Sequence, residues 1–255
     1  MSETGENPSK APAITLGFWI VKIAATTLGE TGGDTVSMTM NLGYLVGTAI
    51  FLSLLVALVV AQVMARRFHP FLYWATIVAS TTCGTTLADF ADRSLGIGYA
   101  GGSTLLFACV LASLLAWLRT EGTVSVARID RPRVEIFYWV TITFSQTLGT
   151  ALGDWAADSG LGYGGGALVF LAALALVAAA YFATNVSRAL LFWCAFILTR
   201  PLGATVGDFL DKPLDQGGLA FSRPLASAIL AIFIVLCILI IPQRPGGHPS
   251  GEGAR

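Results

Sequence analysis

The chain has 255 residues, of which 55% are hydrophobic and 12% are charged, and its formal net charge at pH 7 is zero. A soluble domain has about 25% charged residues, so this composition indicates an integral membrane protein. The zero net charge argues against a nucleic-acid partner. The four cysteines all lie in apolar segments and form no CxxC pair, which argues against a disulfide framework and against a zinc site.

Eight apolar segments are long enough to cross a membrane, since a helix needs about 20 apolar residues to span the hydrocarbon core. In chain order they are residues 14–36, 43–65, 71–91, 99–118, 135–157, 164–183, 189–210 and 224–241. We expect the first to be a retained span rather than a signal peptide, because no cleavage site follows it. The prediction is an all-α transmembrane domain over 14–241, with a loop at 119–134 and polar tails at 1–13 and 242–255.

A repeated motif begins in every second segment with an aromatic pair that ends in Trp. A glycine follows ten residues after each Trp and an aspartate fifteen residues after it, with a small residue just before the aspartate. The tryptophans are Trp19, Trp74, Trp139 and Trp193, and the aspartates are Asp34, Asp89, Asp154 and Asp208. The small residues are Gly29 and Gly33, Gly84 and Ala88, Gly149 and Gly153, and Gly203 and Gly207. The pattern predicts four two-helix repeats, at about 14–65, 71–118, 135–183 and 189–241.

The arginine distribution predicts how these repeats are oriented. Seven arginines lie in the loops after the second, fourth and sixth spans, and two more lie in the C-terminal tail, whereas the opposite loops carry only Arg93, Lys212 and Arg223. Because positive charge accumulates on the cytoplasmic side, both termini should be cytoplasmic. Repeats of two helices all enter the membrane in one orientation, so we expect pseudo-symmetry about an axis along the membrane normal.

The run from Lys22 to Asp34 and its three echoes carry a family resemblance. The chain resembles a family of bacterial multi-pass membrane-anchored proteins that are built from a repeat of unknown function. The resemblance covers nearly the whole chain. It implies a location in the bacterial inner membrane and brings no established activity.

The repeated aspartates form the candidate site. A residue fifteen positions beyond the interfacial Trp lies about 22 Å further along a helix, so the four aspartates should share one depth. Each has a second acid three or four residues away, which places both on nearly one helix face. The candidate cation-binding residues are Glu30, Asp34, Asp89, Asp92, Asp154, Asp158, Asp208 and Asp211. The candidate metal ligands among them are Asp34, Asp89, Asp154 and Asp208.

The small residues of the repeat allow two readings. Gly29 with Gly33, like its three counterparts, forms a small-xxx-small pair that lets membrane helices pack closely. Glycine-rich stretches such as Gly32–Gly33 and Gly164–Gly166 could instead unwind the helix and expose carbonyl oxygens. The sequence leaves both readings open.

Two cations lie in the same helices as the aspartates. The residues seven positions after each Trp are Thr26, Thr81, Gln146 and Arg200. Lys22 and Arg200 each lie eight residues before an acid, about 12 Å along the helix, which is too far for direct pairing within one helix. We expect each to meet an acid of a neighbouring repeat. For Lys22 the alternative is that its side chain reaches up to the cytoplasmic surface.

The charge balance predicts a function. The two deep bases are Lys22 and Arg200, and the five deep acids are Glu30, Asp34, Asp89, Asp154 and Asp208. If all are ionised, three carboxylates stay unpaired and need a proton, a metal or water. Carboxylate, hydroxyl and amide oxygens suit protons, sodium, magnesium, calcium or manganese. We therefore predict a cation transporter whose partners are the lipid bilayer and a small cation, with no cofactor; a homo-oligomer stays open. The alternative is a membrane scaffold or sensor whose buried charges only fix helix packing. An enzyme is not expected, because no His–Glu metal motif or Ser–His arrangement is present.

Overall fold

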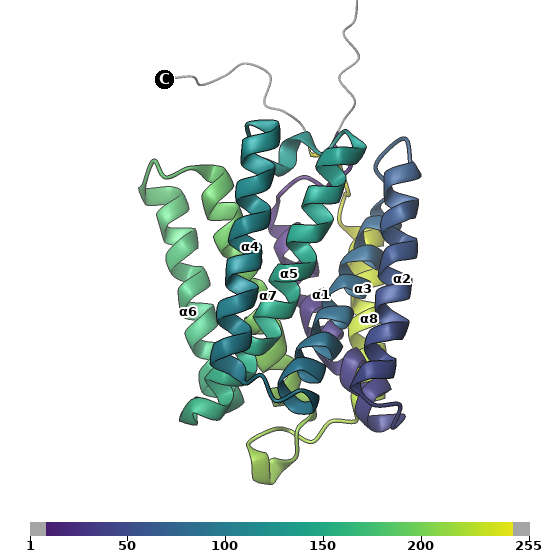
Figure 1. Ribbon diagram of the computed structural model, residues 1–255, viewed down its shortest axis with the longest axis vertical. Coiled ribbons are helices and arrows are strands. Elements are labelled where there is room, and N and C mark those ends of the chain that lie inside the picture. The colour runs from purple at the N-terminus through teal and green to yellow at the C-terminus, as the bar shows by residue number, and fades with distance from the viewer. Residues whose placement is uncertain (1–8, 247–255) are drawn as a thin grey trace, which may run out of the picture.

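The computed structural model describes residues 9–246 and shows eight long α-helices, with no strand among the residues described. The helices run up and down along one direction (Figure 1). They are α1 (Leu16–Asp34), α2 (Tyr44–Met64), α3 (Pro70–Asp89), α4 (Tyr99–Glu121), α5 (Pro132–Ala156), α6 (Gly162–Ala183), α7 (Arg188–Asp211) and α8 (Arg223–Ile240). A π-helical turn extends α1, α3 and α5, at Thr35–Thr39, Phe90–Ser94 and Ala157–Leu161.

Local sequence sets where several helices begin and end. The Thr15 side chain accepts a hydrogen bond from Phe18 N and caps α1, as N-cap threonines commonly do. Pro132 stands in the first turn of α5, where its missing N–H costs nothing. Gly122 ends α4 in the left-handed conformation, with φ of 73°. The loop predicted at 119–134 is shorter in the structure, because α4 continues to Glu121 and α5 already begins at Pro132.

Five helical stretches are long and apolar enough to cross a membrane, judged by length and composition. They are Tyr44–Met64, Tyr99–Glu121, Pro132–Ala183, Arg188–Asp211 and Arg223–Ile240, the third of which runs through α5 and α6. Helices α1 and α3 have similar lengths but bury many threonines and acids. The helix set is therefore compatible with a multi-pass membrane protein.

The first helix of each repeat lies inside the molecule and the second lies outside. Helices α1, α3, α5 and α7 form a ring, in which each contacts the next and α7 contacts α1. Each outer helix packs against the inner helix of the following repeat: α2 on α3, α4 on α5, α6 on α7, and α8 on α1. The outer helices expose large apolar side chains, among them Leu45, Leu54, Leu105, Leu111, Leu168, Leu176, Ile229 and Leu236.

Both ends of the described chain lie at the same end of the bundle, which we call the terminal end (Figure 1). There Ser9 Oγ donates to Val126 O at 3.0 Å, and Lys10 N donates to Ile129 O at 2.7 Å. The Lys10 ammonium also binds Glu135 Oε1 at 2.6 Å. The opposite end holds the connections after α1, α3, α5 and α7, and we call it the turn end.

Candidate cation site

One stripe of side chains on each inner helix faces the centre of the ring. Its members stand four residues apart, so each lies beside the next, and the stripe winds around the helix by about 40° from one member to the next. From the terminal end they form five layers: Phe18, Tyr73, Tyr138 and Phe192; Lys22, Ile77, Ile142 and Phe196; Thr26, Thr81, Gln146 and Arg200; Glu30, Thr85, Thr150 and Ala204; and Asp34, Asp89, Asp154 and Asp208. Every side chain in these layers is at most 7% exposed. The centre therefore changes from aromatic to acidic along its length.

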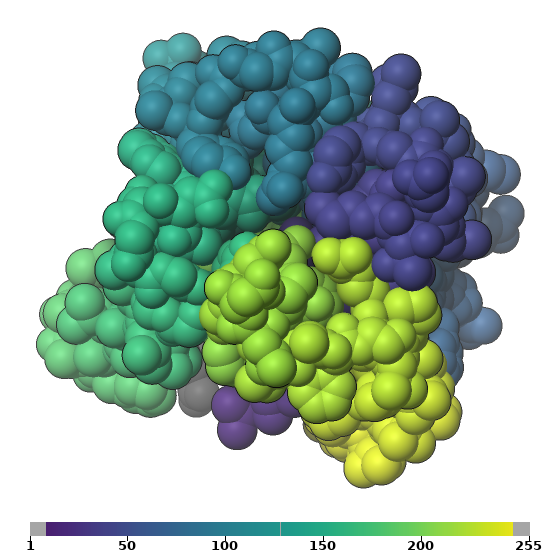
Figure 2. Space-filling view, turned by 90° about the horizontal axis from the view of Figure 1, so that it is seen from below, coloured from purple at the N-terminus to yellow at the C-terminus, as the bar shows by residue number. Residues whose placement is uncertain are grey.

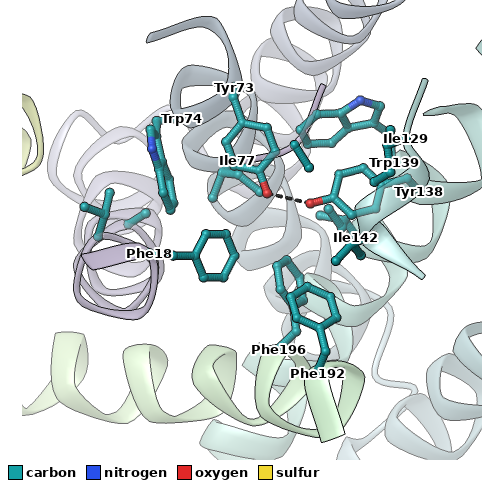
Figure 3. Close-up of a cluster of buried hydrophobic side chains, with 14 of the residues drawn as sticks. Phe18, Tyr73, Trp74, Ile77, Ile129, Tyr138, Trp139, Ile142, Phe192 and Phe196 are labelled. Carbon is teal, nitrogen blue, oxygen red and sulfur yellow. Dashed lines mark hydrogen bonds between the residues drawn. The ribbon is translucent and has the colours of Figure 1, made fainter. Parts of the chain in front are cut away.

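The first layer closes the terminal half of the ring (Figure 3). The Tyr73 and Tyr138 hydroxyls share a hydrogen bond, which joins α3 to α5. The Phe18 and Phe192 rings lie 6.3 Å apart between α1 and α7, and the Phe18 and Trp74 rings lie 5.5 Å apart. Aromatic rings packed at such separations exclude water and stabilise the core. The aromatic layer therefore closes the ring with hydrophobic side chains at the terminal end.

Lys22 does not find the acidic partner expected from the sequence. Its side chain is fully buried, so it does not reach the cytoplasmic surface either. The ammonium lies 4.2 Å from the centre of the Phe196 ring, and Nζ has no hydrogen-bond partner among the described residues. Both expectations for Lys22 are wrong, because Glu30, the nearest acid along its own stripe, is bound by another cation.

That cation is Arg200, which does meet an acid of a neighbouring repeat. Its Nη2 lies 2.8 Å from Glu30 Oε2 on α1. The same nitrogen donates to Thr85 Oγ1 on α3 and to Thr150 Oγ1 on α5, each at 2.5 Å. Since α3 lies across the ring from α7, the guanidinium occupies the centre and links all four inner helices.

Beyond Arg200, six carboxylates meet at the turn end of the ring. These residues, called the acidic cluster below, are Glu30, Asp34, Asp89, Asp154, Asp208 and Asp211. Three overlapping groups of three have carboxylate oxygens within 4.8 Å of one another: Glu30, Asp34 and Asp89; Glu30, Asp154 and Asp208; and Asp34, Asp208 and Asp211. All six residues are at most 6% exposed. The repeated aspartates thus converge as predicted by their common position.

Two predicted members, Asp92 and Asp158, lie outside the acidic cluster. Asp158 is exposed and accepts a hydrogen bond from the Tyr99 hydroxyl at 2.8 Å, and Asp92 is only partly buried. Both belong to π-helical turns, in which each turn holds an extra residue. The turn rotates these side chains off the face predicted from α-helical spacing. Asp211 stays on that face because α7 remains α-helical to its end.

Three bases that the sequence analysis assigned to outer loops fold back onto the acidic cluster. Arg93 Nε lies 2.8 Å from Asp89 Oδ1, and Lys212 Nζ lies 2.8 Å from both Asp34 Oδ2 and Asp208 Oδ1. Arg223 Nε lies 3.3 Å from Asp211 Oδ2. Two of these pairs had a signal in the sequence, because Arg93 follows Asp89 and Lys212 follows Asp208 by four residues.

These bases change the charge balance but do not neutralise the cluster. Six acids against Arg93, Arg200, Lys212 and Arg223 leave two negative charges when all are ionised, not the three expected. Burial works against the charge of Lys212, but Asp208, Asp34 and Asp211 raise its pKa well above the ordinary value. Lys212 therefore stays protonated. The carboxylate oxygens Asp34 Oδ1, Asp89 Oδ2 and Asp211 Oδ1 have no hydrogen-bond partner among the residues described.

The segment between α7 and α8 covers the acidic cluster from the turn end. It folds back through hydrogen bonds from Leu219 N to Phe209 O and from Ala220 N to Lys212 O, at 2.8 and 2.9 Å. Figure 2 shows this yellow-green segment over the middle of the turn-end face. Gly218 permits the fold, since an added Cβ would lie 2.1 Å from Lys212 O. The segment thus holds Lys212 in place.

The repeated glycines pack the inner helices, and the helices run unbroken through them. An added Cβ at the first glycine of each repeat would lie 2.2 to 2.9 Å from the residue seven after the Trp of the next repeat. These pairs are Gly29 with Thr81, Gly84 with Gln146, Gly149 with Arg200, and Gly203 with Thr26. The second small residues also pack closely: a Cβ added at Gly207, for example, would lie 2.7 Å from Glu30 Cβ. The packing reading is confirmed, and local unwinding at Gly32–Gly33 and Gly164–Gly166 is wrong because both stretches are α-helical.

The fold and the site define a helical repeat protein in which four inner helices surround a buried acidic cluster, and its apolar helices are compatible with a multi-pass membrane protein. The family described as Repeat of Unknown Function (DUF347) matches the chain four times, over residues 17–68, 72–123, 137–187 and 191–242. The chain belongs to this family, which confirms the resemblance carried by the repeated motif. No curated protein and no solved structure matches the chain.

Proposed function

We propose that the protein transports a small cation across the bacterial inner membrane through the acidic cluster. The observation that carries the proposal is that six buried carboxylates outnumber the four bases beside them, and that three carboxylate oxygens lack partners in the described chain. Carboxylates at membrane depth are costly and tend to mark an ion pathway. The oxygen ligands suit a proton, sodium, magnesium, calcium or manganese.

In this proposal all eight helices cross the membrane. Polar inner helices are tolerated there because the apolar outer helices separate them from lipid. The arginine-rich loops support a cytoplasmic location for both termini, in which case the acidic cluster faces the outer side. The same glycine contact at each step of the ring supports pseudo-fourfold symmetry about the membrane normal.

The two closures of the ring give the proposal a mechanism. On the cytoplasmic side the cation meets Arg200 and the aromatic layer, and on the outer side it meets Lys212. A cation that enters from outside replaces the Lys212 ammonium at Asp34 and Asp208, since both positive groups need the same oxygens. Movement of Arg200 away from Glu30, together with separation of the aromatic layer, would then open the path inward. Such alternating closure is the general requirement for transport around a fixed site.

The second candidate function is a scaffold or sensor that carries nothing. The full set of contacts to Arg200 favours it, because one guanidinium joins all four inner helices. Buried ion pairs can fix one helix arrangement without any ligand. This function predicts no cation flux, and it predicts that loss of one cluster acid changes stability alone.

The test is a flux assay in proteoliposomes over protons, sodium, magnesium, calcium and manganese. We expect flux of one of these cations in the wild type and flux at the level of empty vesicles for Asp154→Asn. The matched control is Asp158→Asn, four residues on and outside the acidic cluster, which should retain wild-type flux. Equal flux in wild type and Asp154→Asn, with both well folded, contradicts the proposal, and no flux of any cation in the wild type favours the scaffold.

A further inference from the structure

Four hydrogen-bond donors in the second and third layers of the ring have no acceptor among residues 9–246. They are Lys22 Nζ, Thr81 Oγ1, Gln146 Nε2 and Arg200 Nε, one from each inner helix. All four residues are 0% exposed. The amide oxygen of Gln146 also lacks a partner within the described part of the chain. Thr26, the remaining member of the third layer, is satisfied, because its hydroxyl donates to the carbonyl oxygen of Thr199 at 3.1 Å.

Burial of so many unsatisfied donors is unfavourable unless something accepts from them. An unpaired buried polar group destabilises the folded protein, and an unpaired charge destabilises it more. The Phe196 ring offsets only part of this for Lys22, because a cation–π contact does not replace the lost hydrogen bonds of an ammonium group. The four donors belong to four different helices and to two adjacent layers of one ring, so a single acceptor at the centre is the simplest way to satisfy them.

Charge and space limit what this acceptor is. Glu30 neutralises Arg200, so Lys22 in its protonated form leaves one positive charge in these layers. The surrounding helices are in close contact, since an added Cβ at Gly29 would lie 2.4 Å from Thr81 Cγ2 and one at Gly149 would lie 2.2 Å from Arg200 Cγ. The aromatic layer closes the space on the terminal side. A small ion of single charge satisfies both limits.

We propose that Lys22, Thr81, Gln146 and Arg200 Nε bind a small monovalent inorganic anion such as chloride at the centre of the ring. The anion accepts from all four donors and neutralises Lys22. The site adjoins the acidic cluster, because Arg200 contacts Glu30, but its Lys22 layer lies twelve residues of helix, about 18 Å, from the aspartate layer. It does not depend on cation transport, because a scaffold with the same buried donors needs the same anion.

The experiment measures binding of radiolabelled chloride to the purified full-length protein in detergent, with sodium gluconate to hold ionic strength constant. We expect saturable binding of one chloride per chain that unlabelled bromide displaces. Thermal unfolding in chloride should have a higher midpoint than in gluconate. Saturable binding supports the site, and its absence from the folded wild type overturns it in favour of water or an uncharged lysine.

Substitutions locate the anion. Lys22→Met should abolish binding, and Gln146→Leu and Thr81→Val should each weaken it about tenfold or more, because a hydrogen bond to a charged group contributes that much. The latter two remove no charge and settle the question if Lys22→Met fails to fold. Asp154→Asn should keep chloride binding while it loses cation flux, which separates this proposal from the previous one. Chloride binding that persists in Gln146→Leu and Thr81→Val, or that disappears in Asp154→Asn, contradicts the assignment.

Discussion

The terminal half and the turn half of the ring use the same helices and the same stripe, yet their interiors differ in kind. At the terminal half four aromatic residues pack against one another, and the hydroxyls of Tyr73 and Tyr138 satisfy each other. At the turn half six carboxylates meet four bases and remain two charges short of neutrality. The repeat builds the frame in both halves. Departures from the repeat, at Glu30, Lys22 and Arg200, create the boundary between them.

Loss of Arg200 should break this boundary and have the largest effect on stability. Arg200→Ala leaves Glu30 buried and unpaired, so we expect a loss of about 3–5 kcal/mol in the free energy of unfolding. Chemical denaturation in detergent measures it. The double variant Arg200→Met with Glu30→Gln should recover most of that loss. Simple additivity of the two single changes would show that the pair is not coupled.

The glycine contacts of the ring should show the next largest effect. Gly29→Ala places a methyl group 2.4 Å from Thr81 Cγ2, and overpacking of this kind costs about 1–3 kcal/mol. Gly32→Ala is the matched control on the same helix, because its nearest neighbour, Leu28 Cδ1, lies 3.9 Å away. Thermal unfolding should show a lower midpoint for Gly29→Ala and no decrease for Gly32→Ala. Equal behaviour of the two variants would be inconsistent with a ring packed at Gly29.

Lys212 tests the turn half alone. Lys212→Gln removes a charge that contacts Asp34 and Asp208, so the transported cation should bind more tightly, by about tenfold or 1.4 kcal/mol. Half-saturation of flux and calorimetric binding both measure this change. Arg131→Gln is the control, since it removes a cation from an exposed pair with Glu121 at the terminal end. Weaker cation binding in Lys212→Gln would mean that Lys212 supports the site rather than competing for it.

The smallest effect is expected at the aromatic layer. Tyr73→Phe leaves the Tyr138 hydroxyl without its partner and should lower the free energy of unfolding by about 1 kcal/mol. Cation flux per folded molecule should not change, because the substitution keeps the aromatic ring that closes the layer. Tyr73→Phe combined with Tyr138→Phe should restore stability, as neither hydroxyl is then left unpaired. A change in cation selectivity in either variant would place the layer in the cation path as a direct ligand.

The sequence predicts the repeated helices and their packing better than it predicts the details of the site. Convergence of the repeated aspartates follows from equal spacing on equivalent helices, and close packing follows from Gly29 and its counterparts. The π-helical turns at Phe90–Ser94 and Ala157–Leu161 were not predictable from α-helical periodicity, and they move Asp92 and Asp158 away. Arg223 also lacked a local signal, because its contact with Asp211 forms only when the segment between α7 and α8 folds back.

The most direct test of the central claim is calorimetric titration of the transported cation into wild type, Asp154→Asn and Asp158→Asn. The two variants lose the same charge in the same repeat, but only Asp154 belongs to the acidic cluster. The account predicts saturable binding in the wild type and in Asp158→Asn, and none in Asp154→Asn. Undiminished binding in Asp154→Asn, or equal loss in both variants, would contradict it.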